Sequence, residues 1–223
     1  MDHGGLNPHH ESDVRAAYDA VARQYDEQFA HELDPKPLER ALLKAFVEAA
    51  GAGVIADVGC GPGHVSRLLA HHGAEVLGLD LSPAMIDIAR ARAPDLPFRV
   101  ASMLELPVSD GAWAGAVAMY SIIHLTEHER ARACHELARA IRPNGQLLVA
   151  FHVDSGEFAT GEVNHLTEFL GQPVELDGYF LDPRAVEVQL AGAGFRTTAR
   201  LQREPMPDIE YPSRRCYLLA QRR

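Results

Sequence analysis

Three glycines follow an aspartate at the end of a short apolar segment, at Asp57, Gly59, Gly61 and Gly63. Closely spaced glycines allow the backbone to turn tightly and to approach a ligand. A helix that begins directly after them can hold an anionic group with its free amides. The Asp57 carboxylate suits a neighbouring cation or ammonium group better than a pyrophosphate. The segment therefore predicts a site for a small ligand that carries charges of both signs.

A second carboxylate, Asp80, ends the next apolar segment, seventeen residues after Gly63. A carboxylate at this place can accept hydrogen bonds from both hydroxyls of a ribose. A dinucleotide loop has the pattern Gly-x-Gly-x-x-Gly, but its last position counted from Gly59 is His64. The two motifs therefore favour a nucleoside ligand other than a nicotinamide dinucleotide, and an NAD-dependent oxidoreductase is the more distant alternative.

The elements around these motifs alternate between short apolar runs and helical periodicity. Strands are expected near 53–58, 75–80, 98–100, 115–120, 146–152, 195–201 and 214–220, and helices near 12–29, 35–51, 65–72, 82–93, 127–141 and 183–193. The alternation predicts an α/β fold, namely a Rossmann-like doubly wound sheet of seven strands. The sheet should be mostly parallel with one antiparallel strand, because no helix separates the last two strands.

The 223 residues fit a single domain, residues 1–223, with a core of its own. Residues 1–12 are polar and are expected to be flexible, whereas residues 13–50 should form two helices. Residues 153–182 show the weakest pattern and could be an insertion that caps the substrate. Within it, Leu166, Phe169 and Leu170 suggest a short helix.

Composition excludes several classes of function. The chain has 21 basic and 31 acidic residues and a net charge of −10, so it should repel nucleic acids and anionic membranes. Its three cysteines are scattered, as expected for free thiols in the cytoplasm. The twelve histidines are dispersed, and adjacent ones such as His71 and His72 do not point the same way on a helix, so no metal site is predicted. No apolar run is long enough to span a bilayer.

The glycine block resembles the first motif of the class I S-adenosylmethionine (SAM)-dependent methyltransferases, and the resemblance extends over roughly residues 13–221. Residues 79–85 are similar to the second motif of this family, residues 101–107 to the stretch that lines the adenine, and residues 142–146 to the turn before the fifth strand. The resemblance implies SAM as the cofactor and S-adenosylhomocysteine as the product.

The resemblance also implies residue roles. Asp80 would hold the ribose, and Leu81 and Met85 would flank the adenine. Ser102 stands where many relatives have an aspartate, so its contact with the adenine amino group should be weaker. The cofactor-binding residues expected in this way are Tyr18, Asp57, Gly59, Cys60, Gly61, Gly63, Asp80, Leu81, Met85, Ser102, Met103, Leu104 and Tyr120.

Two tyrosines of the first helix, Tyr18 and Tyr25, lie seven residues apart and so share one face. Their segment resembles the lid helix of small-molecule methyltransferases, which implies that residues 13–50 form the lid helices, a helical N-terminal lid. The two tyrosines could reach the carboxylate of SAM or close the substrate pocket. Plain packing is the alternative, since Val14 and Val21 share that face.

Two histidines follow strands whose ends should face the reacting methyl group. His124 comes after the fourth strand and is placed to act as a general base, or else to orient the substrate or cap a helix. His152 ends the fifth strand on the same rim. The expected catalytic residues are therefore His124, Tyr25 and His152.

The pattern as a whole predicts a methyltransferase for a small-molecule acceptor, of the kind found in bacterial natural-product biosynthesis. The reaction would be an SN2 transfer aided by proximity. An O-methyltransferase acting on a hydroxyl or carboxyl is the first choice and an N-methyltransferase the second. A carboxylate acceptor would need a cation such as Arg214.

Other classes are not favoured. A non-catalytic SAM-binding module would not need a closing lid. The Pro-Cys and Asn/Asp-Pro-Pro-Tyr/Phe motifs of DNA methyltransferases are missing from the sequence. The chain is expected to act as a monomer or a homodimer.

Overall fold

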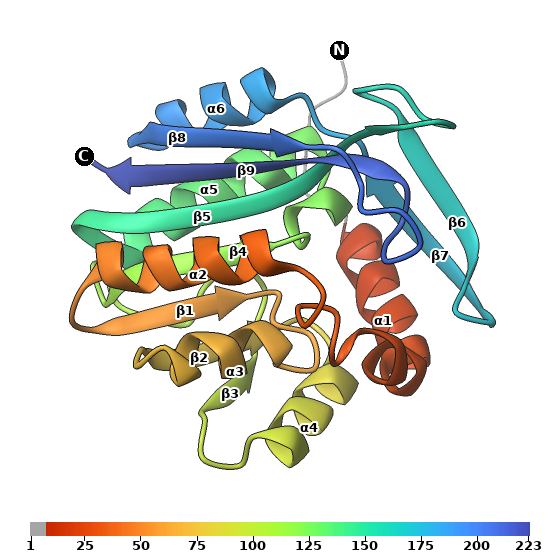
Figure 1. Ribbon diagram of the computed structural model, residues 1–223, viewed down its shortest axis with the longest axis horizontal. Coiled ribbons are helices and arrows are strands. Elements are labelled where there is room, and N and C mark those ends of the chain that lie inside the picture. The colour runs from red at the N-terminus through yellow and green to blue at the C-terminus, as the bar shows by residue number, and fades with distance from the viewer. Residues whose placement is uncertain (1–7) are drawn as a thin grey trace.

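A seven-stranded sheet crosses the molecule in the order β3-β2-β1-β4-β5-β9-β8 (Figure 1). The computed structural model describes residues 8–223, with side chains from residue 10 onward. The strands are β1 (Val54–Val58), β2 (Glu75–Asp80), β3 (Phe98–Val100), β4 (Trp113–Met119), β5 (Ile141–Ser155), β8 (Phe195–Arg203) and β9 (Ser213–Arg222). The first five pair in parallel, and β9 runs antiparallel to both neighbours. The predicted sheet is thereby confirmed, including its single antiparallel strand.

Helices connect the strands, and their starts follow local capping chemistry. They are α1 (Pro8–Phe29), α2 (Pro37–Ala50), α3 (His64–His71), α4 (Pro83–Arg92), α5 (Glu127–Ala140) and α6 (Pro183–Gly192), with a short 3₁₀ turn η1 (Ile122–His124). Ser82 caps α4 by accepting a hydrogen bond from the Met85 amide, as its sequence position predicts. Thr126 and Glu129 form a reciprocal capping box at α5.

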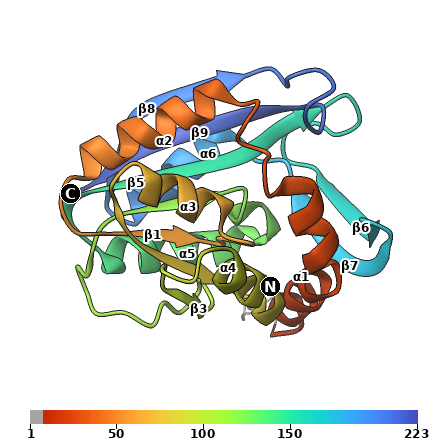
Figure 2. The same ribbon diagram turned by 60° about the horizontal axis from the view of Figure 1, so that its bottom comes forward.

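The sheet separates two parts of the core, because successive side chains of a strand point to opposite faces. In β1, Ile55 packs with α2 and α3, whereas Ala56 packs on the side that α5 and α6 cover. Figures 1 and 2 show these helix pairs on opposite faces of the sheet. Both faces of the central strands are therefore buried, and the parallel register is fixed.

The segment 153–182 corrects one prediction. Its expected short helix is wrong: residues 163–179 form an antiparallel hairpin of β6 (Val163–Phe169) and β7 (Gln172–Tyr179). Leu170 and Gly171 at the tip both have positive φ, 51° and 77°, which suits a tight two-residue hairpin turn. The apolar residues 166, 169 and 170 match helical spacing by chance. The turn at residues 170 and 171 reverses the chain and so excludes a helix there.

The hairpin packs against α1, which is called the lid helix below. Ala17 and Val21 of the lid helix contact Val174 and Leu176 of β7 in a small buried cluster separate from the main core. Figure 2 shows the lid helix beside this hairpin. The insertion thus supports the lid from outside.

The N-terminal prediction changes as well. Residues 8–12, expected to be flexible, are the first turns of the lid helix. His10 Nδ1 lies 3.0 Å from Glu129 Oε2, so a long-range contact orders this stretch. Residues 1–7 of the predicted flexible segment lie outside the described residues. Within the described part, no helix is long and apolar enough to cross a membrane.

Candidate cofactor and acceptor site

The glycine loop between β1 and α3 adopts a backbone that only glycine accepts readily. Gly59, Gly61 and Gly63 all have positive φ, from 52° to 79°. A Cβ on Gly59 would lie only 2.2 Å from Cβ of Ser121. The Gly59 and Cys60 amides donate to the Leu79 carbonyl at 2.7 and 3.0 Å, which ties the loop to the end of β2. The predicted close approach of backbone is therefore built into the loop.

Asp80 lies beside this loop and holds it. Its Oδ2 accepts from the Gly61 amide and its Oδ1 from the Ser82 amide, each at 2.8 Å. Burial raises the pKa of Asp80 to about 6, although these amides favour the ionised form. Each oxygen keeps a further lone pair, so the carboxylate can still accept two hydroxyl groups.

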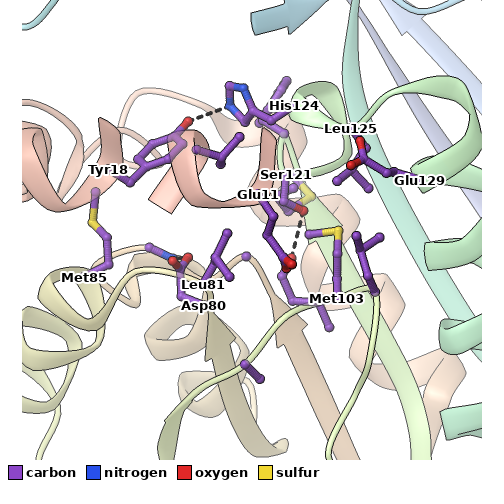
Figure 3. Close-up of a pocket in the computed structure, with 18 of the residues that line it drawn as sticks. Glu11, Tyr18, Asp80, Leu81, Met85, Met103, Ser121, His124, Leu125 and Glu129 are labelled. Atoms are coloured by element: carbon purple, nitrogen blue, oxygen red, sulfur yellow. Dashed lines mark hydrogen bonds between the residues drawn. The ribbon is translucent and has the colours of Figure 1, made fainter. Parts of the chain in front are cut away.

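A first cavity opens above Asp80, with an empty volume of about 810 Å³ that includes its mouth. Figure 3 shows the lid tyrosine Tyr18 and His124 on the side opposite Asp80, Leu81 and Met85. Of the residues predicted from sequence, this cavity is lined by Tyr18, Tyr25, Gly59, Gly61, Asp80, Leu81, Met85, Met103, Leu104, Tyr120 and His124.

A second cavity, with an empty volume of about 480 Å³, adjoins the first. The two share five lining residues, which are Tyr25, Gly59, Gly61, Met119 and Tyr120. They therefore meet over the glycine loop. Among the predicted residues, Cys60 lines only this second cavity.

Charged side chains line the second cavity. The Lys36 ammonium lies 2.8 Å from Glu32 Oε2, and His64 Nε2 lies 2.8 Å from Glu32 Oε1. Burial opposes ionisation of Glu32, but its bonds to His64 and Lys36 prevail and hold its pKa at about 2. Among the described residues, Glu39 Oε2 and His64 Nδ1 are buried without a hydrogen-bond partner. Such buried polar atoms call for a polar ligand.

Four predicted site residues line neither cavity. Asp57 is 1% exposed and lies behind the loop, where Ser66 donates to it at 2.6 Å and burial raises its pKa to about 6. Gly63 faces the Phe98 and Ala89 side chains, so it serves packing. The Ser102 hydroxyl accepts from the Leu104 amide at 3.0 Å, which fixes the local turn.

His152 is the fourth of these residues. Its Nδ1 lies 2.6 Å from the Ser213 hydroxyl, and its ring packs on Tyr120. Burial, aided by the charge of Arg215, lowers the pKa of His152 to about 3. His152 therefore supports Tyr120 from behind. The geometry argues against the catalytic role expected for it.

His124 lies in the first cavity but is not free. Its Nε2 is 2.6 Å from the Tyr18 hydroxyl, and its Nδ1 is 2.7 Å from the Asp177 carbonyl oxygen. Burial lowers the pKa of His124 to about 4 and raises that of Tyr18, so both are neutral at ordinary pH. Tyr18 thus joins the lid helix to the end of η1 across the cavity (Figure 3).

Sequence reasoning missed several residues of the first cavity. Those that were not among the expected cofactor-binding or catalytic residues are His10, Glu11, Val14, Val58, Ala101, Met119, Ser121, Leu125 and Glu129. A signal was present for some of them: Glu11 and Val14 share the helix face of Tyr18, seven and four residues before it. Glu129 is recognisable only as the partner in a capping box.

The two cavities fit SAM by their chemistry. Asp80 and the apolar side chains of Leu81 and Met85 suit an adenosine. The charged second cavity, with an unpartnered carboxylate oxygen and an unpartnered ring nitrogen, suits the ammonium and carboxylate of an amino-acid end. The glycine loop between them permits close approach. Among residues 8–223, no group of three or more His, Cys, Asp or Glu side chains could hold a metal ion.

Comparisons with known proteins agree with this chemistry. A family model described as a methyltransferase domain matches residues 55–145. A demethylmenaquinone methyltransferase of Beutenbergia cavernae is 29% identical over 65% of this chain and 58% of its own length. The O-methyltransferase resE of Aspergillus sclerotiorum is 32% identical over 43% of this chain and 38% of its own length. The chain thus spans little more than half, or less, of these relatives.

A solved structure extends the likeness to the whole fold. Magnesium protoporphyrin IX methyltransferase from Synechocystis PCC 6803, solved with bound SAM, superimposes with a TM-score of 0.70 at 17% identity and covers 100% of both chains. At that identity the likeness concerns the fold. Sequence motifs, cavity chemistry and topology point to the same group of proteins. A methyltransferase-domain model thus matches residues 55–145 of the chain, and the fold as a whole is that of solved SAM-dependent methyltransferases.

Proposed function

We propose that this protein transfers the methyl group of SAM to an oxygen atom of a small-molecule acceptor. The observation that carries the proposal is the pair of cavities that meet over the glycine loop, one beside Asp80 and one lined by charged groups. Relatives named as O-methyltransferases support oxygen as the methylated atom. The acceptor is proposed to be a small molecule because the lid helix covers the site and the net charge of −10 disfavours nucleic acid.

Named side chains would hold the cofactor. The Asp80 carboxylate would accept the two ribose hydroxyls, while Leu81, Met85, Met103 and Leu104 would enclose the adenine. In the second cavity, Glu39 offers an unpartnered oxygen to the ammonium group. Lys36 and His64 offer donors to the carboxylate. When bound, SAM supplies a methyl group that a sulfonium has already activated.

The protein itself contributes position and exclusion of water. Tyr18 and Tyr25 project from the lid helix into the first cavity, where Tyr25 also borders the second. Buried aromatic side chains at the junction of the cavities keep water from the reacting atoms. Alignment of two bound reactants can lower a barrier by about 7–11 kcal/mol, so little further assistance is needed.

The first experiment is calorimetric titration of the protein with SAM, S-adenosylhomocysteine and NAD. The proposal expects micromolar binding of the first two, loss of that binding in Asp80→Ala, and retention in Asp87→Ala, which removes an exposed carboxylate of the following helix, α4. Methyl transfer from labelled SAM to small hydroxyl compounds follows. A folded protein that binds NAD tightly and SAM not at all contradicts the proposal. SAM binding without transfer to any acceptor would favour a non-catalytic module.

A further inference from the structure

The positions of the protons in the Tyr18–His124 pair follow from their partners. The Asp177 carbonyl oxygen, 2.7 Å from His124 Nδ1, can only accept a hydrogen bond, so Nδ1 carries the ring proton. In a neutral ring, Nε2 then holds a lone pair. The Tyr18 hydroxyl, 2.6 Å away, must donate to it. This leaves lone pairs on the Tyr18 oxygen free for another donor.

Neither ring nitrogen of His124 is therefore available to an acceptor directly. The sequence prediction that His124 is the base in contact with substrate does not fit this arrangement. Both side chains line the cavity, but Tyr18 has an oxygen with accepting capacity, whereas His124 is 7% exposed and both of its ring nitrogens are engaged. The pair can still move a proton, because a hydroxyl can accept one proton while it passes on another.

We propose that Tyr18 and His124 form a proton relay that deprotonates a neutral, weakly acidic hydroxyl on an aromatic acceptor. This inference rests on the methyl transfer proposed above. The acceptor hydroxyl donates to the Tyr18 oxygen, and Tyr18 donates to His124 Nε2. As the acceptor oxygen forms its bond to the methyl carbon, the carbon–sulfur bond breaks and its electron pair stays on sulfur.

Protons and charge balance in this step. The acceptor proton moves to Tyr18, the Tyr18 proton moves to His124, and an imidazolium results with both nitrogens hydrogen-bonded. One positive charge is lost when the sulfonium becomes a thioether, and one is gained on the ring. The net charge of the closed site is unchanged, so no ion has to enter or leave it during the step. Tyr18 begins and ends as a neutral phenol.

The walls of the first cavity favour an uncharged acceptor. Among its described lining residues there is no lysine or arginine, whereas Glu11 and Glu129 are present. A carboxylate acceptor would find no lysine or arginine side chain there to pair with, so its burial would be costly. Arg214, considered above as such a partner, pairs with Asp154 near the carboxyl end of β5 and does not line the cavity.

The same region favours a flat ring. The rings of Tyr18 and Tyr25 lie 5.9 Å apart in an edge arrangement, and both make similar edge contacts with Phe169. Aromatic side chains at such spacings stabilise a further ring by edge and offset contacts. A phenol combines the ring with a neutral hydroxyl that must lose its proton.

The test compares an acceptor that needs a base with one that does not. At pH 8, phenol is protonated, because its pKa is close to the value of about 10 for a tyrosine side chain, whereas 4-nitrophenol is largely ionised. Single-turnover transfer is measured with saturating SAM in wild type, Tyr18→Phe and His124→Gln. Tyr211→Phe, the same change at an exposed tyrosine away from the cavity, is the matched control.

The relay predicts a selective effect. Tyr18→Phe and His124→Gln should lower the rate with phenol by at least about 10²-fold, the usual contribution of acid–base catalysis. The rate with 4-nitrophenol should fall much less, and SAM binding by calorimetry should persist. Equal losses with both phenols, or transfer to neither, would overturn the relay. Transfer to aniline in place of phenol would overturn the hydroxyl assignment.

A second readout needs no turnover. Nitrogen-15 NMR of histidine in the SAM-free protein should show His124 neutral, with its proton on Nδ1 and with an Nε2 signal that shifts in Tyr18→Phe. A proton on Nε2 would overturn the relay. If wild type bound no SAM, the proposed function would fail while this NMR result still stood, so the two failures are distinguishable.

Discussion

Asp19 of the lid helix and Ser82 at the start of α4 are hydrogen-bonded, with Asp19 Oδ1 2.5 Å from Ser82 Oγ. The same carboxylate oxygen accepts from the Ala84 amide at 3.1 Å. Since Asp80 and Met85 flank this turn and line the first cavity, the contact links the lid to the wall on which the adenosine is proposed to rest. Closure of the lid and binding at that wall should therefore be coupled.

Asp19→Ala tests this coupling. Loss of two hydrogen bonds to a charged acceptor, each worth about 1.5–3 kcal/mol at most, should weaken SAM binding by roughly tenfold through a less populated closed lid. Calorimetry measures the affinity, and hydrogen exchange should show faster exchange in residues 8–29. Asp13→Ala removes an equal charge from an exposed position of the same helix. Equal affinities of the two variants would show that the contact is not coupled to binding.

The affinity for SAM should depend on the ionisation of Asp80. Its pKa is raised to about 6, so the carboxylate is ionised above about pH 7 and gains a proton as the pH falls through 6. Protonation removes accepting capacity toward the ribose and a charge that attracts the cation. Affinity should be constant from pH 7 to 8 and weaken toward pH 5, in titrations checked with Asp80→Asn. A Kd unchanged down to pH 5 would contradict a role for the ionised carboxylate.

With saturating SAM, the rate of methyl transfer through the proton relay should not depend on pH in this range. Burial and the nearby His10 lower the pKa of His124, while the Asp177 carbonyl and charge raise it, with a result of about 4. His124 therefore stays neutral, and single-turnover transfer to phenol should be constant from pH 8 down to about 5. A decline centred near 6.5, as for an ordinary imidazole, would show that His124 is solvated during the reaction.

The contact of Gly59 with Ser121 can be tested with a double variant. In Gly59→Ala the new Cβ would overlap Cβ of Ser121, and the residue would be strained at φ 79°. SAM affinity should fall at least about tenfold, or 1.4 kcal/mol. Adding Ser121→Gly removes the overlap but not the strain, so part of the affinity should return. Gly73→Ala, strained at φ 88° with no atom nearby, should leave affinity unchanged. Failure of the double variant to improve would indicate that strain alone disrupts the loop.

A buried ion network next to the second cavity should matter for stability. Arg203 is hydrogen-bonded to both Glu39 and Glu210, whose side chains are 2% and 3% exposed. Arg203→Ala removes a positive charge that offsets the negative charges of these two buried carboxylates. It should therefore lower the free energy of unfolding by about 3 kcal/mol. Arg200→Ala, which breaks an exposed pair with Glu187, should cost under about 1 kcal/mol. Urea denaturation of both variants compares the two, and similar midpoints would contradict the network's role.

The part of the site around the glycine loop and Asp80 was predictable from local sequence. The pairing register of strands β1 and β2 explains why. Val58 pairs with Leu79 in adjacent parallel strands, so the residues that follow, Gly59 and Asp80, must emerge side by side. A strand–loop–helix pattern fixes such neighbours without reference to the rest of the chain. Leu81 and Met85 then follow Asp80 into the same wall.

The acceptor side was not predictable in the same way. The hairpin of β6 and β7 has apolar spacing that mimics a helix, and only its turn and its packing on the lid helix select the strands. Asp177 reaches His124 from that hairpin, 53 residues away in sequence. His152 has the residue type and strand end expected of a catalytic group, yet its partner Ser213 lies behind the site.

The sequence by itself thus determined the α/β sheet, the glycine loop and the place of Asp80 beside it, because periodicity and short-range motifs encode them. Tertiary structure alone decided that Tyr18 meets His124, that Asp177 sets the ring proton, and that charged groups gather in the second cavity. The physical reason is that hydrogen-bond partners and desolvation come from segments far apart in the chain. They exist only once the lid, the hairpin and the sheet have packed together.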